Sequence, residues 1–162
     1  MTRAARAALA VAAGLLVLPT RAADALVPVD ETAFRKVIGS HRGKIVVADF
    51  WATWCEPCRE EMPGLAALAR KWRRRGVVLV TVSADEPEQE QAALEFLGKT
   101  GVPPPAYVKR ASSDEDFINS VDRAWSGALP ALFIYDRQGR QAGRFTGETE
   151  LSQVEDAIRK LL

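Results

Sequence analysis

Residues 54–58 read Trp54-Cys55-Glu56-Pro57-Cys58 and contain the only two cysteines of the 162-residue chain. The run before them is apolar and predicts a buried strand, while the run after them has the apolar spacing of an amphipathic helix. A Cys-x-x-Cys pair between a strand and a helix indicates a redox site. The N-terminus of the helix carries unpaired N–H groups and partial positive charge, and both stabilise a thiolate on the first cysteine.

The two cysteines are expected to have different tasks. Cys55 lies at the helix N-terminus and should be the more exposed thiol, so we expect it to be the nucleophile that attacks a disulfide. Cys58 follows one helical turn later and is expected to be the resolving thiol that releases the product. The charge of Glu56 and the missing N–H of Pro57 disfavour the thiolate. The pair is therefore predicted to act as a reductant rather than as an oxidant.

Other uses of the cysteine pair fit the sequence less well. A structural zinc site needs about four ligands, whereas the chain offers two thiols and one histidine, His41. A Cu(I)-binding metallochaperone stays open as the alternative function, since soft thiolates suit Cu(I). Met1 and Met62 are the only thioethers of the chain, so no methionine-rich cluster accompanies the dithiol. We expect no resident metal, and no cofactor beyond the redox-active disulfide between Cys55 and Cys58.

The first 25 residues predict a secretory signal peptide. Arg3 and Arg6 form a basic start, and residues 7–18 form an apolar run that is too short to span a bilayer comfortably. Residues 23–25 read Ala-Asp-Ala and offer a cleavage site. An uncleaved anchor that faces the same compartment is the alternative. The chain is thus expected to be exported to the periplasm, with a possible membrane tether.

Residues 26–162 are expected to form one domain. The first 25 residues hold three arginines and one aspartate, so their removal changes the net charge from +1 to about −1. A nearly neutral domain gives no reason to expect nucleic-acid binding. Export places the cysteines where disulfides persist. An exported domain with a single Cys-x-x-Cys pair is not stapled by disulfides, so we expect it to act on the disulfides of other proteins.

Hydrophobic periodicity predicts an alternation of strands and helices along the chain. A βαβ unit followed by a hairpin and a final helix implies a mixed sheet with helices on both faces. The expected strands are residues 44–51, 77–83, 106–109, 130–136 and 140–145, and the expected helices are residues 31–38, about 55–75, 88–99, 117–121 and 149–162, with Gly76 as a C-cap.

The extended motif resembles the active-site signature of thioredoxin-fold proteins. Residues 49–63 read DFWATWCEPCREEMP, and the segments on either side of the cysteines are similar to those of the TlpA/ResA-like branch. Residues 127–136 begin Gly-Ala-Leu-Pro and resemble the cis-proline segment of the family. The resemblance covers about residues 30–162. It implies an α/β thioredoxin fold with a central mixed β-sheet flanked by helices, and a TlpA-type αβ insert before the cis-proline strand.

The resemblance also assigns roles to two acidic residues. Asp49 lies in an apolar strand, where a carboxylate is costly unless it is paired or functional. The matching acid of thioredoxins helps to deprotonate the resolving thiol, although TlpA/ResA-like proteins often carry Asn there. Glu61 follows Cys58 by three residues on the same helix face. It matches a glutamate that tunes the proton chemistry of ResA-like sites, and an ordinary surface glutamate is the alternative.

A substrate-binding surface is implied around the cysteines. Pro130 is expected to be cis and to face the cysteine pair, and the backbone of Leu129 is expected to pair with an extended peptide. Trp54 should flank the nucleophile and form part of the docking surface, together with Glu56 and Pro57.

The resemblance implies a protein thiol–disulfide oxidoreductase. Its partners would be disulfide-bearing or dithiol proteins, with apocytochrome c or a copper-site assembly protein as candidates, and a membrane protein would supply the electrons. A peroxidase of the same fold is disfavoured, because peroxiredoxins carry Thr three positions before the reactive cysteine and this chain has Ala52 there.

Overall fold

A six-stranded mixed sheet forms the centre of the molecule in a computed structural model that describes residues 25–162. The strand order is β1-β4-β3-β2-β5-β6, with β1 to β4 parallel and β5 and β6 antiparallel to their neighbours. The strands are β1 (Val27–Val29), β2 (Ile45–Trp51), β3 (Val77–Ser83), β4 (Tyr107–Lys109), β5 (Ala131–Tyr135) and β6 (Gln141–Thr146).

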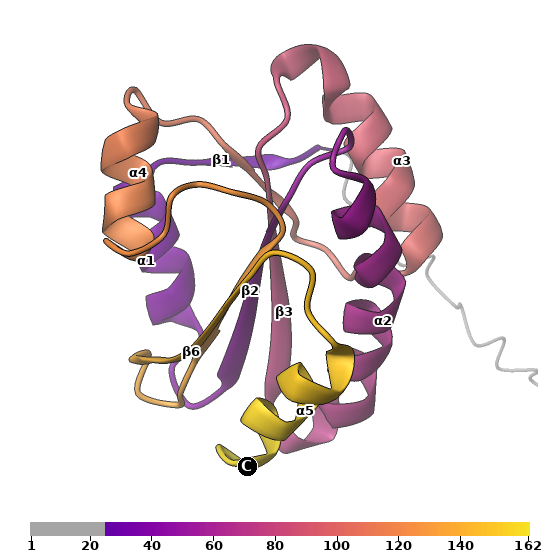
Figure 1. Ribbon diagram of the computed structural model, residues 1–162, viewed down its shortest axis with the longest axis vertical. Coiled ribbons are helices and arrows are strands. Elements are labelled where there is room, and N and C mark those ends of the chain that lie inside the picture. The colour runs from indigo at the N-terminus through magenta and orange to yellow at the C-terminus, as the bar shows by residue number, and fades with distance from the viewer. Residues whose placement is uncertain (1–24) are drawn as a thin grey trace, which may run out of the picture.

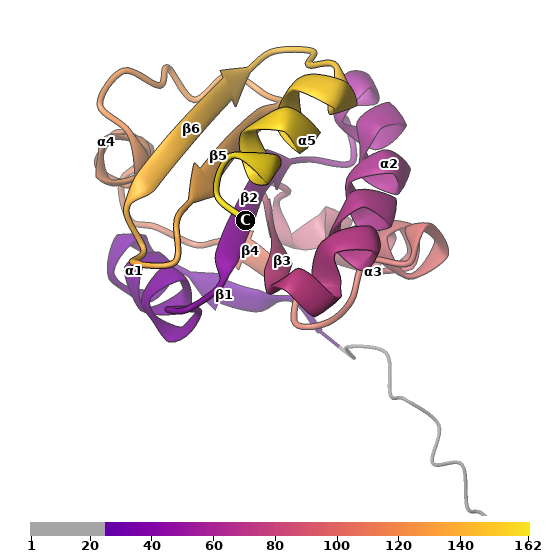
Figure 2. The same ribbon diagram turned by 90° about the horizontal axis from the view of Figure 1, so that it is seen from below.

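Helices cover both faces of this sheet (Figure 1). One face carries α2, α3 and α5, and the other carries α1 and α4, as the view from below also shows (Figure 2). The helices are α1 (Glu31–Ser40), α2 (Glu56–Trp72), α3 (Glu90–Thr100), α4 (Asp114–Val121) and α5 (Leu151–Arg159). The predicted α/β fold with a mixed sheet between two helical layers is therefore confirmed.

Strand β2 is central because it is apolar on both faces. All seven of its residues are buried. Side chains alternate between the faces of a sheet, so Val47 and Trp51 pack under α2 and α3, while Val46 and Phe50 pack under α1 and α4. Such a continuous apolar run is what a parallel strand between two helical layers requires.

Helix α2 begins directly after the loop that follows β2. Cys55 is its N-cap, and Pro57 lies in the first turn, where a missing N–H costs nothing. The helix ends in a single 3-10 turn (Arg73–Arg75) before Gly76, whose φ of 84° lies in the left-handed region. Glycine adopts this conformation without a steric penalty. The predicted C-cap at Gly76 is thus confirmed.

The segment between β3 and β5 forms the expected αβ insert. It contains α3, β4 and α4, and β4 lies in the sheet between β1 and β3. Helix α4 is longer than expected, because the hydroxyl of Ser113 caps it by accepting a hydrogen bond from the N–H of Asp116. Strand β1 was not expected, since a three-residue strand has too few positions to show an alternating pattern.

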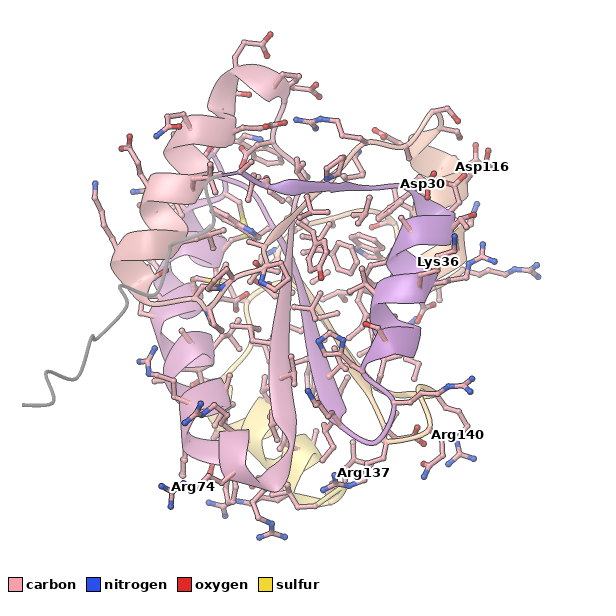
Figure 3. The ribbon with its side chains drawn as sticks, turned by 180° about the vertical axis from the view of Figure 1, so that it is seen from behind. Asp30, Lys36, Arg74, Asp116, Arg137 and Arg140 are labelled. Carbon is pink, nitrogen blue, oxygen red and sulfur yellow. A yellow bond between two sulfur atoms is a disulfide. The ribbon has the colours of Figure 1, made fainter. Side chains whose placement is uncertain are left out.

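Arginine side chains gather at the end of the sheet where β2 and β3 begin. Arg74, Arg137 and Arg140 lie at this end in the rear view (Figure 3). The guanidinium of Arg137 donates hydrogen bonds of 2.9 Å to the carbonyl of Gly43 and of 3.0 Å to the carbonyl of Arg75. It therefore ties the β5–β6 turn to the loops that precede β2 and β3, at the end of β2 remote from the cysteines.

The predicted signal peptide falls almost entirely on residues 1–24, which lie outside the described residues, so the division at residue 25 stays a prediction. Within residues 25–162, no helix combines the length and the apolar character that crossing a membrane demands.

Candidate functional site

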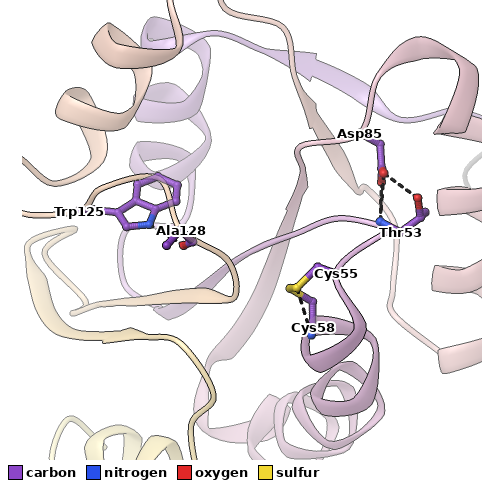
Figure 4. Close-up of a disulfide and its surroundings, with 6 residues drawn as sticks. All are labelled: Thr53, Cys55, Cys58, Asp85, Trp125 and Ala128. Carbon is purple, nitrogen blue, oxygen red and sulfur yellow. Dashed lines mark hydrogen bonds between the residues drawn. A yellow bond between two sulfur atoms is a disulfide. The ribbon is translucent and has the colours of Figure 1, made fainter.

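Cys55 and Cys58 form a disulfide at the N-terminus of α2 (Figure 4). The Sγ atom of Cys55 accepts a hydrogen bond of 3.4 Å from the backbone N–H of Cys58. Cys55 is 6% exposed and Cys58 is completely buried, in the order that the sequence led us to expect. A helix N-terminus that points an N–H at the outer sulfur is suited to stabilise negative charge on that atom.

The residues between the cysteines lie at the surface. The side chain of Glu56 is exposed and that of Pro57 is half-buried. Trp54 is 67% exposed and is one of two large hydrophobic side chains that residues 25–162 leave exposed. An indole displayed beside a disulfide offers apolar area to an incoming protein.

The loop from Trp125 to Pro130 leads into the strand beside β2. The Leu129–Pro130 peptide bond is cis, as expected. The antiparallel register pairs Ala131 with Phe50. Pro130 therefore lies next to the end of β2 from which the chain enters the cysteine loop. Trp125 is buried against Phe50, and its indole N–H donates a hydrogen bond of 2.9 Å to the carbonyl of Ala128 (Figure 4). This bond braces the loop that carries Leu129.

Asp49 is completely buried, and neither of its carboxylate oxygens has a hydrogen-bond partner among residues 25–162. It shares the strand face of Val47 and Trp51, which is the face covered by α2. The hydroxyl of Thr81, its register partner on β3, is also buried and finds no hydrogen-bond partner in the same range. Burial and the nearby charge of Glu61 hold the pKa of Asp49 well above its ordinary value. The role of Asp49 in the chemistry of the cysteines stays a prediction.

Glu61 is coupled to two other acids. Burial and the charge of Glu148 raise the pKa of Glu61 from 4.5 to about 7. One of its carboxylate oxygens is buried and has no hydrogen-bond partner within the described part of the chain. It lines a groove of about 650 Å³ together with Pro57 and Glu148. Glu61 is partly buried, and its predicted role in proton transfer stays a prediction. Glu148 follows β6 and is far away in the sequence, which is why the local motif gave no sign of it.

A second residue that the sequence did not single out is Asp85. Its buried carboxylate accepts hydrogen bonds of 3.0 Å from the backbone N–H of Thr53 and of 2.7 Å from the hydroxyl of the same residue (Figure 4). The hydroxyl of Ser83 donates to it as well, at 2.7 Å. An acid two residues after an apolar strand is a signal that could have drawn attention to it.

Within residues 25–162, there is no group of three or more histidine, cysteine, aspartate or glutamate side chains arranged to hold a metal ion. The two sulfurs are joined to each other, so the described site is that of a redox disulfide.

The model of the AhpC/TSA family matches residues 22–140. The thiol–disulfide oxidoreductase ResA of Bacillus thuringiensis (strain Al Hakam) is 29% identical over 120 residues, which are 74% of this chain and 65% of ResA. ResA of Bacillus subtilis (strain 168) is 28% identical over 127 residues, with 78% and 66% covered. The chain thus spans slightly less than two thirds of the length of these relatives.

Solved structures agree with the fold. A secreted thiol–disulfide isomerase from Corynebacterium glutamicum superposes with a TM-score of 0.67 at 20% identity, covering 76% of this chain and 74% of the other. A DsbF homologue from Corynebacterium diphtheriae gives a TM-score of 0.65 at 21% identity, covering 76% of each chain. The resemblance to ResA-like proteins with a thioredoxin fold is therefore confirmed. With a family model that matches most of its length, this chain belongs to the AhpC/TSA family.

Proposed function

We propose that the protein is an exported thiol–disulfide oxidoreductase that reduces disulfides in partner proteins through Cys55 and Cys58. The observation that carries this function is the disulfide at the N-terminus of α2, with the N–H of Cys58 aimed at the sulfur of Cys55. The names of the ResA relatives, which are thiol–disulfide oxidoreductases, support it.

In the proposed reaction, the reduced protein transfers two electrons to its substrate. The Cys55 thiolate attacks one sulfur of the substrate disulfide; that S–S bond breaks, and the leaving sulfur takes up a proton. A mixed disulfide between Cys55 and the substrate results. The Cys58 thiol then loses its proton, and its thiolate attacks the Sγ atom of Cys55. The second substrate sulfur leaves and takes up a proton, so the substrate ends as a dithiol and the protein as a disulfide.

Two carboxyl groups are proposed to handle the proton of Cys58. Asp49 lies on the strand face that α2 covers, and its raised pKa makes its carboxylate a stronger proton acceptor than an ordinary aspartate. Glu61 influences Asp49 through its charge and lines the groove beside Pro57. We propose that Glu61 passes the proton between Asp49 and solvent.

The substrate is proposed to be an extended segment of a protein. Trp54 supplies exposed apolar area beside the nucleophile. The register of β5 with β2 places Leu129 near the end of β2 that leads to the cysteines. An extended peptide that pairs with the backbone of Leu129 would bring its disulfide toward Cys55. Apocytochrome c or a copper-site assembly protein is the candidate substrate, and a membrane protein is the candidate electron donor.

Export is part of this proposal. It rests on the basic and apolar pattern of the first 25 residues. The name of the similar structure from Corynebacterium glutamicum, a secreted thiol–disulfide isomerase, supports it. A full-length chain with a C-terminal tag should be recovered from the periplasmic fraction of cells. Recovery from the cytosol at full length would contradict export.

Trapping tests the exchange reaction. A Cys58→Ala variant lacks the resolving thiol, so the mixed disulfide at Cys55 should accumulate and should disappear on treatment with dithiothreitol. The matched Cys55→Ser variant should trap nothing and should not reduce a protein disulfide. Reduction by Cys55→Ser at the wild-type rate would overturn the assignment of the nucleophile.

A further inference from the structure

We propose that Asp85 and Thr53 form a clamp that positions Cys55 and Trp54 for the exchange reaction, so this inference rests on the function proposed above. Within residues 25–162, neither residue donates a hydrogen bond to a sulfur atom, so both are positioning residues. The clamp joins the end of β3 to the loop between β2 and α2.

The carboxylate of Asp85 is held in place by hydrogen bonds and in turn holds the loop that precedes α2. Its side chain is completely buried, yet three donors face its two oxygens: the backbone N–H of Thr53, the hydroxyl of Thr53 and the hydroxyl of Ser83. The backbone N–H of Asp85 also donates a hydrogen bond of 2.9 Å to the hydroxyl of Ser83. A buried carboxylate is tolerated only where donors of this kind surround it. The arrangement fixes the loop at one residue, Thr53.

The position of Thr53 determines what the clamp can control. The backbone N–H of Cys55 donates a hydrogen bond of 3.1 Å to the carbonyl of Ala52, so the chain turns tightly around Thr53 and Trp54. With Thr53 held from β3, Trp54 is directed to solvent and Cys55 becomes the N-cap of α2. The sulfur of Cys55 then meets the N–H of Cys58.

The clamp is braced by the insert. The guanidinium of Arg110, which follows β4, donates a hydrogen bond of 2.8 Å to the carbonyl of Asp85. The same guanidinium forms an ion pair with Glu90 at the start of α3. A continuous set of contacts thus runs from the insert through Asp85 to the cysteine loop. It gives the insert a mechanical role in holding the site.

The decisive variant is Thr53→Val, because valine keeps the shape of threonine and removes only the hydroxyl. The charged groups around the cysteines are unchanged in it: Glu56, Arg59 and Glu61 on α2, Asp49 on β2, and Glu148 after β6. The readout is the rate at which iodoacetamide alkylates Cys55 in the reduced full-length protein with Cys58→Ala, measured as a function of pH.

A loosened loop weakens the hydrogen bond that stabilises the Cys55 thiolate. We expect alkylation of Thr53→Val at pH 7 to slow by roughly threefold or more, with its midpoint at a higher pH, since hydrogen bonds to charged groups are the strong ones. Thr53→Ser keeps the hydroxyl and should behave like wild type. Asp116→Asn, a change of an exposed aspartate on α4, is the control for the loss of one carboxylate and should leave the profile unchanged.

Asp85→Asn tests the other half of the clamp. It replaces an acceptor by an amide group and should also slow alkylation; if this variant does not fold, the two Thr53 variants decide the question alone. An unchanged pH profile in Thr53→Val, even with a lowered melting temperature, would overturn the positioning role. Alkylation does not require a protein substrate. The alkylation experiment can therefore contradict the clamp even if the wild type exchanges disulfides, and it can support the clamp even if the wild type exchanges none.

Discussion

At the scale of single residues, burial raises the pKa of two carboxyl groups in the candidate site, those of Asp49 and Glu61. Asp49 holds its proton longer in the folded chain than in the unfolded chain, because its pKa is raised by burial and by Glu61. The folded state therefore binds more protons than the unfolded state once the pH exceeds the ordinary pKa of an aspartate carboxyl group. Stability falls as the pH rises through this window.

Replacement of Asp49 by Asn should remove this loss of stability at high pH. Oxidised Asp49→Asn is expected to be more stable than oxidised wild type at pH 8, by on the order of 1–3 kcal/mol, and the difference should shrink toward pH 4. Urea unfolding of both proteins at several pH values measures it. Parallel stability curves for the two proteins would show that Asp49 does not titrate in this range.

Glu148 is expected to control the protonation of Glu61. Its charge contributes to the raised pKa of about 7 at Glu61, so Glu148→Gln should lower that pKa toward its ordinary value. NMR titration of the glutamate side-chain carboxyl groups would report the change. Glu150→Gln is the matched control, because Glu150 lines the same groove but is not among the causes of the shift. An equal shift in both variants would argue against a specific coupling.

At the scale of elements, backbone conformation decides where α2 ends and β3 begins. Gly76 has a φ of 84°, and a Cβ atom there would lie 3.1 Å from the guanidinium of Arg137. This guanidinium also holds the carbonyl of Arg75. A side chain at residue 76 would therefore meet both a strained backbone and a contact that ties three loops together.

A pair of glycine substitutions tests this account. Gly76→Ala should destabilise the protein by about 1 kcal/mol or more, because alanine adopts a positive φ only at a cost. Gly39→Ala is the control. Gly39 lies in α1, and no atom of residues 25–162 lies within 4 Å of the position that a Cβ atom would take. Alanine should therefore be neutral or stabilising there by up to about 1 kcal/mol. Thermal unfolding of both variants gives the comparison. Equal melting temperatures would refute the role assigned to Gly76.

At the scale of the whole molecule, the sequence was sufficient to predict those features of the fold and of the candidate site that leave a local or periodic pattern in it. The apolar run of β2, the Cys-x-x-Cys pair and the Leu-Pro segment led to the fold and to the residues around the disulfide. The residues that were missed act at long range: Asp85 reaches Thr53 across 32 positions, and Glu148 reaches Glu61 only when α5 packs on α2. No spacing rule relates such pairs, because they meet through tertiary packing.

The direction of electron transfer is also a property of the whole molecule, and unfolding measures it. If the protein is a reductant, folding favours the disulfide over the dithiol, and by linkage the disulfide stabilises the fold. The oxidised protein should then unfold at a higher urea concentration than the protein kept reduced by dithiothreitol. A potential difference of about 30 mV between folded and unfolded chains corresponds to about 1.4 kcal/mol. Cys58→Ala cannot form the disulfide and should show no response to dithiothreitol. A reduced form more stable than the oxidised form would reverse the proposed polarity, since the folded chain would then favour the dithiol and act as an oxidant.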